Sequence, residues 1–338
     1  MQSADSVVAT RDGRVGRIVL NRSQALNALD IEMLRACTCA LDAWRLDPRV
    51  HAVVIEGAGE RAFCAGGDIR AIRQAHVEGR TDEVEAFFSE EYALNLIIAS
   101  YPKPYIALID GICMGGGIGV SVHGAYRVAT EHALLAMPET AIGFFPDIGA
   151  TYAFPRLPGN LGTYLALTGA RLHGADAVHA GLATHFVPRA GLPALKRDLA
   201  ADGTTVLALH AAPLPAFSLA PHREVIDRAF AADSIPEILR LLRDDGGAFA
   251  ARTVETLRSM SPSALSWSLR LLREGANRTL PQCLEAELRA SRTVTAGHEF
   301  IEGVRAMVVD KDRTPRWSPA RIEDVTASMI DAMLGVTQ

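Results

Sequence analysis

Two carboxylates stand eight residues apart on a segment that is expected to be a loop. Glu139 and Asp147 flank the aromatic pair Phe144 and Phe145. Carboxyl groups near apolar side chains can have their pKa values moved apart, so that one acts as an acid and the other as a base. The alternative is that both are ordinary exposed loop charges. The pair predicts acid–base chemistry, subject to that alternative.

Two glycine-rich turns each connect an expected strand to an expected helix. They are Cys64–Ile69, with the sequence CAGGDI, and Met114–Gly119, with the sequence MGGGIG. Small residues let a ligand approach the backbone, and N–H groups at a helix start can bind an oxyanion. Neither turn has the spacing of a phosphate-binding loop. An ordinary tight turn or close packing of a helix on a sheet is the alternative for each. Together they suggest that two N–H groups converge on one carbonyl oxygen.

Three single charged residues are further candidates. Glu91 shares a helix face with apolar residues, so it is either a site residue or a tolerated boundary charge. Lys311 could bind a phosphate, although a lone lysine is more often a solvated surface charge. Asp68 could cap the helix that follows the first glycine turn.

The expected elements alternate between strands and helices. Strands are predicted at 14–20, 51–56 and 105–110, and helices at 30–44 and 82–99. This order favours parallel strands joined by helical crossovers, which is an α/β fold. From about residue 190 the strand pattern fades. We therefore predict two regions, a core at 1–190 and a mostly helical region at 191–338.

Composition excludes several classes of protein. The formal net charge of -5 over 338 residues does not favour nonspecific binding to nucleic acid. Five cysteines without a CxxC pair predict reduced thiols, and the scattered histidines predict no metal site. The most apolar stretch, at 105–122, is interrupted by Asp110 and several glycines, so no membrane span is expected. The N-terminus lacks a secretory pattern, and a cytoplasmic location is predicted.

Four stretches match a known superfamily in order and approximate spacing: LNRSQALNAL, AFCAGGDI, KPYIALIDGICMGGGIG and MPETAIGFFPDIGATYAFPRL. They cover roughly residues 14 to 190 and resemble the crotonase (enoyl-CoA hydratase/isomerase) superfamily. The resemblance implies an α/β fold, a spiral of ββα turns with a helical C-terminal region, and an acyl-CoA substrate. It also implies an oxyanion hole formed by the N–H groups of Gly67 and Gly116. The coenzyme A contacts it implies are at Ala65, Asp68, Ile69 and Lys311.

Further stretches narrow the resemblance to one subfamily. PETAIGFFPD, FFSEEYALN, GLATHFV and FIEGVRAMVVDKDRTPRW look like the 3-hydroxyisobutyryl-CoA hydrolases. Hydratases typically carry a glutamate where this chain has Gly119, and a glycine where it has Asp147. The subfamily resemblance implies substrate contacts at Glu91, Gly116, Glu139 and Asp147.

This chain also departs from the family pattern at two places. It has Gln24 where lysine is frequent, and Ala150 and Thr151 where relatives often have glycines. The first departure puts one contact to a coenzyme A phosphate in doubt.

The resemblance implies hydrolysis of a short, branched 3-hydroxyacyl-CoA, and with it a place in valine catabolism. Glu139 would activate a water or attack the thioester to form an acyl anhydride, and Asp147 would bind the 3-hydroxyl or orient the reacting groups. Coenzyme A is part of the substrate, so no separate cofactor is expected, and a homo-oligomer is possible. The alternatives are an enoyl-CoA hydratase or isomerase, and an inactive acyl-CoA-binding protein.

Overall fold

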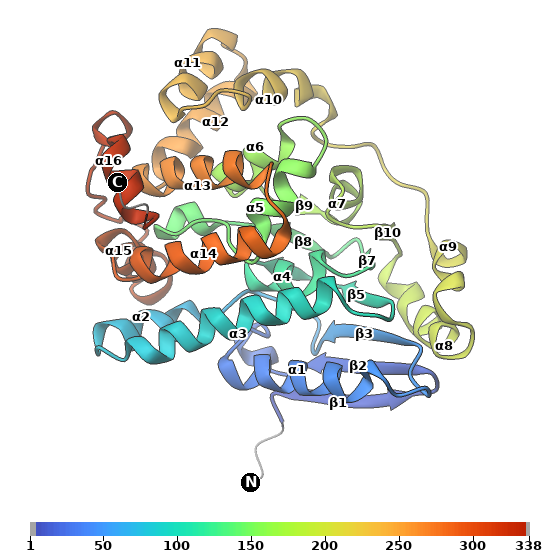
Figure 1. Ribbon diagram of the computed structural model, residues 1–338. Coiled ribbons are helices and arrows are strands. Elements are labelled where there is room, and N and C mark those ends of the chain that lie inside the picture. Colours follow the sequence, from blue (N-terminus) through green and yellow to red (C-terminus); the bar gives the residue numbers. More distant parts are fainter. Residues whose placement is uncertain (1–4, 336–338) are drawn as a thin grey trace. The chain divides into compact units, whose positions relative to one another are not determined.

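The computed structural model describes residues 5–335, which form two compact units (Figure 1). Within the described residues, the first unit comprises 5–68, 90–136 and 171–218. The second comprises 69–89, 137–170 and 219–335. All strands of the described residues belong to the first unit.

The larger of two sheets has the strand order β1-β2-β3-β5-β7-β10. Its strands are β1 (Val7–Asp12), β2 (Val15–Leu20), β3 (Ala52–Gly57), β5 (Tyr105–Ile109), β7 (Tyr126–Ala129) and β10 (His185–Phe186). Only the pair β1 and β2 is antiparallel. The parallel strands carry near-continuous apolar residues, as buried parallel strands do.

The smaller sheet has the order β4-β6-β8-β9. Its strands are β4 (Ala62–Cys64), β6 (Ile112–Met114), β8 (Leu134–Ala136) and β9 (Leu172–His173), of which β9 is antiparallel to β8. Successive strands alternate between the sheets, from β3 to β4, from β5 to β6 and from β7 to β8, and a helical segment follows each pair. This repeated ββα turn confirms the predicted α/β spiral.

The first unit also contains several helices. They are α1 (Ile31–Arg45), α4 (Gly116–Val122), α7 (Gly174–Ala180), α8 (Leu192–Asp202), α9 (Leu207–His210) and the C-terminal part of α3 (Thr81–Ala99). Val54, Leu108 and Val128 of the sheet form one cluster with Leu195 and Leu199 of α8. The larger sheet and α8 therefore share one hydrophobic core.

Within residues 5–335, every secondary-structure element of the second unit is a helix or a helical turn. Its helices are α2 (Ile69–Val77), the start of α3, α5 (Ala150–Ala153), α6 (Leu161–Thr168), α10 (Arg223–Ala229), α11 (Ile235–Asp245), α12 (Ala248–Ser259), α13 (Pro262–Gly275), α14 (Leu280–Val294), α15 (His298–Val304) and α16 (Ala327–Met333). Its short turns are η2 (Glu139–Ile142), η3 (Phe154–Arg156), η6 (Ala220–His222) and η8 (Ile322–Asp324) of 3-10 type, and η7 (Arg305–Val309) of π type. The 3-10 turns of the first unit are η1 (Ser23–Ala25), η4 (Arg189–Gly191) and η5 (Gly203–Val206). The helical C-terminal region is confirmed, and the domain boundary near residue 190 stays a prediction.

Candidate functional site

The backbone of the first glycine turn forms a parallel β-bridge between Gly67 and Leu29. Leu29 N donates to Gly66 O at 2.8 Å, and Asp68 N donates to Leu29 O at 2.8 Å. In this parallel pattern the N–H of the middle residue, Gly67, faces away from Leu29. Gly66 has a φ of +106°, which favours glycine. The turn is thus fixed with the Gly67 N–H directed away from the bridge.

The second glycine turn ends where α4 begins. Gly115 has a φ of +47°, and its carbonyl accepts hydrogen bonds from Ile118 N at 2.8 Å and Gly119 N at 3.3 Å. Gly116, the first residue of α4, lies in the turn whose N–H groups have no partner inside the helix. A Cβ placed on Gly116 would lie 3.2 Å from Gly67 N. The two turns therefore meet at Gly67 and Gly116.

Glu91 lies at the same place. Glu91 belongs to α3 and is 2% exposed. Its Oε1 atom occupies the space that a Cβ on Gly116 would enter. Burial raises the pKa of the neighbouring Cys64 thiol well above its usual range, and the Glu91 carboxylate adds to that rise. Cys64 is therefore a protonated thiol at neutral pH and is not the nucleophile. All five cysteines are free, as predicted.

Arg22 was not identified from the sequence, although it organises this region. Its guanidinium pairs with Asp30 at 3.0 Å and with Asp68 at 3.1 Å. Asp30 also accepts from Met33 N at 2.9 Å, which confirms it as the N-cap of α1. Arg22 therefore joins the start of α1 to the end of the first glycine turn.

Asn27, like Arg22, was not identified from the sequence. It is fully buried and donates to Ala58 O at 3.0 Å and Ala62 O at 2.9 Å. Just beyond, Ala65 N donates to Leu26 O at 3.0 Å. The only signal for Asn27 was its place in the LNRSQALNAL stretch.

In the second unit, the loop that carries the two carboxylates is buried. Glu139 begins η2, and the residue is 7% exposed, while Asp147 is 5% exposed. Phe144 and Phe145 stack on each other with ring centroids 4.4 Å apart. The alternative that both carboxylates are exposed loop charges is therefore wrong.

Other elements of the second unit hold this loop. Phe144 also contacts Phe88 and Phe300, with ring centroids 5.7 and 5.6 Å away. Thr140 donates its hydroxyl to Leu167 O at 3.1 Å. The loop is thus tied to α3, α6 and α15 by packing and a hydrogen bond.

A third carboxylate, Glu287 of α14, reaches the end of the same loop. It accepts hydrogen bonds from Gly149 N at 2.7 Å, Thr151 N at 3.2 Å and Thr151 Oγ1 at 2.5 Å. Burial, and to a lesser extent the charge of Asp147, raise the pKa of Glu287 to about 8 against the opposing effect of these hydrogen bonds. Glu287 was not identified from the sequence. The available signal was a charged residue on a buried helix face, as for Glu91.

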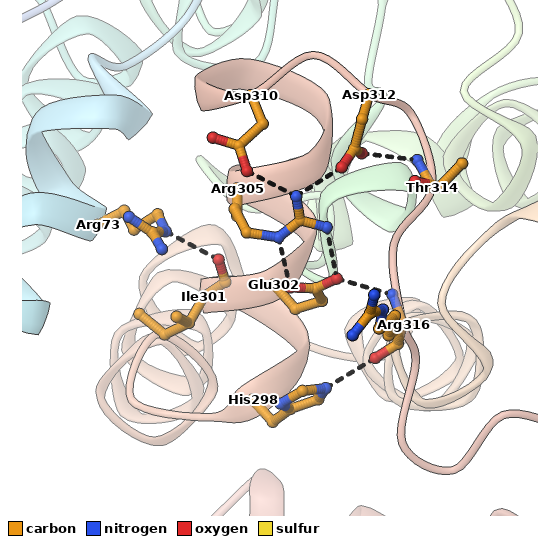
Figure 2. Close-up of polar contacts among 9 residues, drawn as sticks. All are labelled: Arg73, His298, Ile301, Glu302, Arg305, Asp310, Asp312, Thr314 and Arg316. Carbon is orange, nitrogen blue, oxygen red and sulfur yellow. Dashed lines mark hydrogen bonds and ion pairs between the residues drawn. The ribbon is translucent and has the colours of Figure 1, made fainter.

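The segment that carries Lys311 is organised by Arg305 (Figure 2). Arg305 pairs with Asp310 at 2.7 Å, Asp312 at 2.6 Å and Glu302 at 2.8 Å. The Arg305 hydrogen bonds lower the pKa of Glu302 and of Asp312, each to about 2. Both aspartates that flank Lys311 are therefore paired with one guanidinium, and the exposed Lys311 has a φ of +59°.

Two arginines of α2 hold the same segment. Arg73 donates to Ile301 O at 2.9 Å, as Figure 2 shows, and Arg70 donates to Val308 O at 2.7 Å. Helix α2 begins at Ile69, one of the predicted coenzyme A contacts. In the second unit, the positions of Ile69 and Lys311 are thus linked through these arginines.

The structure brings Gly67, Gly116 and Glu91 together in the first unit and holds Glu139 and Asp147 on one buried loop of the second. Among residues 5–335, no group of three or more His, Cys, Asp or Glu side chains is arranged to hold a metal ion. The coenzyme A and catalytic roles of the named residues stay predictions.

Comparison with known proteins gives one consistent family. A family model described as enoyl-CoA hydratase/isomerase matches residues 15–334. A Xenopus tropicalis protein named 3-hydroxyisobutyryl-CoA hydrolase, mitochondrial, is 47% identical over 96% of this chain and 87% of its own length. The human protein of the same name is 45% identical with the same two coverages.

Solved structures agree on the fold. A carnitinyl-CoA dehydratase from Mycobacterium thermoresistibile has a TM-score of 0.94 and 40% identity, covering 98% of this chain and 96% of its own. An enoyl-CoA hydratase from Rhodobacter sphaeroides has a TM-score of 0.92 and 38% identity, covering 98% and 97%.

Proposed function

Because the chain belongs to the enoyl-CoA hydratase/isomerase family, we propose that it hydrolyses the thioester of 3-hydroxyisobutyryl-CoA or of a similarly short, branched 3-hydroxyacyl-CoA. Relatives of the name 3-hydroxyisobutyryl-CoA hydrolase, similar over nearly the whole chain, support this substrate. The structural observation that carries the proposal is the burial of both Glu139 and Asp147 on one loop, while residue 119 is a glycine.

The thioester carbonyl binds at the meeting point of the two glycine turns. The oxygen accepts hydrogen bonds from the N–H groups of Gly67 and Gly116, which are the donors that the tetrahedral intermediate needs. Such donors stabilise developing negative charge because they are oriented before the reaction begins. Glu91, beside Gly116, contacts the substrate at the same place.

Glu139 supplies the nucleophilic or basic carboxylate. As a base, it takes a proton from a water whose oxygen attacks the thioester carbon. The carbon–sulfur bond then breaks, and coenzyme A leaves as a thiol after accepting that proton. As a nucleophile, Glu139 itself displaces coenzyme A, and water then hydrolyses the acyl anhydride. Either route gives the free acid and coenzyme A.

Asp147 reads the 3-hydroxyl of the substrate. A carboxylate accepts several hydrogen bonds, and a site built around a hydroxyl discriminates against an analogue that lacks it. We expect the wild-type enzyme to prefer 3-hydroxyisobutyryl-CoA over isobutyryl-CoA by at least about 100-fold in kcat/KM, and Asp147→Gly to reduce this to less than about 10-fold. The control is Asp233→Gly, which removes a highly exposed carboxylate of the same unit. Equal discrimination by Asp147→Gly and wild type would leave Asp147 as a loop-structuring residue.

The exposed Lys311 binds a phosphate of coenzyme A, and Arg305 suppresses the repulsion that Asp310 and Asp312 would otherwise exert. Lys311→Ala and Arg305→Ala should each raise KM for the coenzyme A thioester about 10-fold, equivalent to about 1.4 kcal/mol. KM for the pantetheine thioester, which lacks the nucleotide, should not change. The control is Arg321→Ala, at an exposed arginine of the second unit. Equal changes in KM for both thioesters would exclude this role.

Thiol release measured over a panel of acyl-CoAs tests the function itself. Rapid release from 3-hydroxyisobutyryl-CoA with slow hydration of crotonyl-CoA supports the hydrolase. Hydration as fast as hydrolysis would support the second candidate, a hydratase, which the names of the similar solved structures favour. Binding without thiol release or hydration would support an inactive acyl-CoA-binding protein.

The location and partners of the protein are predicted mainly from its sequence. Of the helices in residues 5–335, none is long and apolar enough to span a membrane. The cytoplasmic location is a prediction, and the similar hydrolases carry the word mitochondrial in their names. A place in valine catabolism, independence of a separate cofactor, absence of nucleic-acid binding and a homo-oligomeric state are also predictions.

A further inference from the structure

The backbone just after Asp147 is strained. Ile148 has a φ of 55° and is completely buried, and Gly149 follows with a φ of +78°. Positive φ is unusual for a β-branched residue and persists only where the surroundings hold it. Asp147 O closes the turn by accepting from Ala150 N at 2.8 Å. The direction of Asp147 therefore depends on whatever stabilises this turn.

Glu287 is the group that stabilises it. Its two carboxyl oxygens accept hydrogen bonds from the N–H groups of Gly149 and Thr151, which are the first and third residues after Ile148. They also accept a hydrogen bond from the Thr151 hydroxyl. On the other side, Gly275 of α13 packs so closely on the Thr151 backbone that a Cβ there would overlap it. The turn is thus held between α13 and a single buried carboxyl group of α14.

Asp147 and Glu287 also interact electrostatically. The negative charge of Asp147 disfavours ionisation of Glu287, which is itself fully buried. Another titratable group near Glu287 is Cys283, whose thiol pKa is raised mainly by burial and is lowered by the charges of Arg156 and Arg278. Arg156 donates to four carbonyl groups. With a pKa of about 8, Glu287 is mostly protonated at neutral pH.

We propose that Glu287 is a positioning residue that fixes the orientation of Asp147, and that it thereby determines selection for the 3-hydroxyl group. This inference rests on the proposed function, because it concerns how Asp147 reads the substrate. The Thr151 hydroxyl donates an additional hydrogen bond to the same carboxyl group.

Glu287→Gln tests the proposal, with Glu285→Gln as the control on the exposed face of the same helix. Glutamine has one acceptor oxygen where three donors must be satisfied, so the turn should loosen. We expect kcat/KM for 3-hydroxyisobutyryl-CoA to fall at least about 10-fold and that for isobutyryl-CoA to change less than about 3-fold. Glu285→Gln should behave as wild type.

The pH dependence gives a readout that a purely structural role would not change. As pH rises through about 8, Glu287 loses its proton and places a second negative charge beside Asp147. The wild-type preference for the 3-hydroxyl should therefore fall above about pH 8. Glu287→Gln has no proton to lose there, so its weaker preference should stay constant.

A second pair of variants keeps the test open if Glu287→Gln does not fold. The Thr151 hydroxyl bond favours the ionised form of Glu287, so Thr151→Val, which removes it, should move the alkaline fall to higher pH. Thr151→Ser keeps the hydroxyl and should leave the fall in place. Far-UV circular dichroism checks that each variant is folded.

The outcomes separate the inference from the proposed function. If wild type releases no thiol from 3-hydroxyisobutyryl-CoA, the proposed function is wrong. If wild type is active and selective but Glu287→Gln keeps both its selectivity and its alkaline fall, the inference about Glu287 is wrong. An unchanged pH profile in Thr151→Val would also contradict the inference.

Discussion

Replacement of Glu139 by glutamine should lower kcat for thiol release at least about 100-fold, while KM changes little. Glutamine keeps the size and hydrogen-bonding reach of the side chain but can neither accept the proton of an attacking water nor attack the thioester. Acid–base groups contribute about 10²- to 10⁴-fold to rates, so about 100-fold is the lower bound. Glu139 is buried in η2, and glutamine should be accommodated there because it is nearly isosteric.

The control for this prediction is Glu255→Gln, at an exposed glutamate of α12 in the same unit. Steady-state thiol release on 3-hydroxyisobutyryl-CoA measures both variants. Turnover of Glu139→Gln within about 3-fold of the control would remove Glu139 from the mechanism. Hydroxylamine added during turnover of the wild type separates the two routes. Its attack on the Glu139 carbonyl of an anhydride releases the substrate acid and leaves a hydroxamate on the Glu139 side chain, which a water-activating Glu139 would not form.

Elements with strong local patterns were predictable from the sequence. Helix α1 combines a one-sided apolar spacing with an N-cap at Asp30, and the predicted and observed helices agree to within one residue at each end. Helix α3 was predicted in the same way from the spacing of its apolar side chains. These signals are local, because the apolar face of a helix and its N-cap both depend only on residues that are close together in the sequence.

Some short elements carry no such signal. Strand β1 has one buried residue followed by five exposed ones, so it lacks the alternation that marks a half-buried strand. Strand β6 has only three residues. Both form because a neighbouring strand offers hydrogen-bonding partners, and that information lies elsewhere in the chain.

The supporting residues of the candidate site were hidden for the same reason. The carboxyl group of Glu287 binds N–H groups that are 138 and 136 residues away, and Arg22 pairs with Asp68 from 46 residues away. Gly67 and Gly116 stood out because they lie in glycine-rich turns, and Glu139 stood out because Phe144, Phe145 and Asp147 follow it within eight residues. Residues that hold them in place are recognisable only once the fold has brought them together.

The second large effect is expected from Gly116→Ala, which should reduce kcat/KM about 100- to 1,000-fold, the effect of losing one oxyanion donor. The new Cβ would lie 3.2 Å from Gly67 N and 3.2 Å from Leu29 Cδ1, and it would overlap the Glu91 carboxylate. Gly67 cannot withdraw, because its neighbours on both sides are hydrogen-bonded to Leu29. The methyl group therefore takes the space in front of the Gly67 N–H, where the thioester oxygen is proposed to bind.

The substrate panel distinguishes this effect from loss of hydroxyl recognition. Every acyl-CoA has the thioester carbonyl, so Gly116→Ala should lower kcat/KM for 3-hydroxyisobutyryl-CoA and isobutyryl-CoA by the same factor, whereas Asp147→Gly should affect mainly the former. The control is Gly191→Ala, because Gly191 has a φ of -83° and a Cβ there would meet only the end of the Val187 side chain, at 3.3 Å. Thermal unfolding of both alanine variants checks that the fold is intact. A folded Gly116→Ala enzyme with wild-type kcat/KM on both substrates would show that the carbonyl oxygen binds elsewhere, since a bound oxygen and this methyl group cannot occupy the same space.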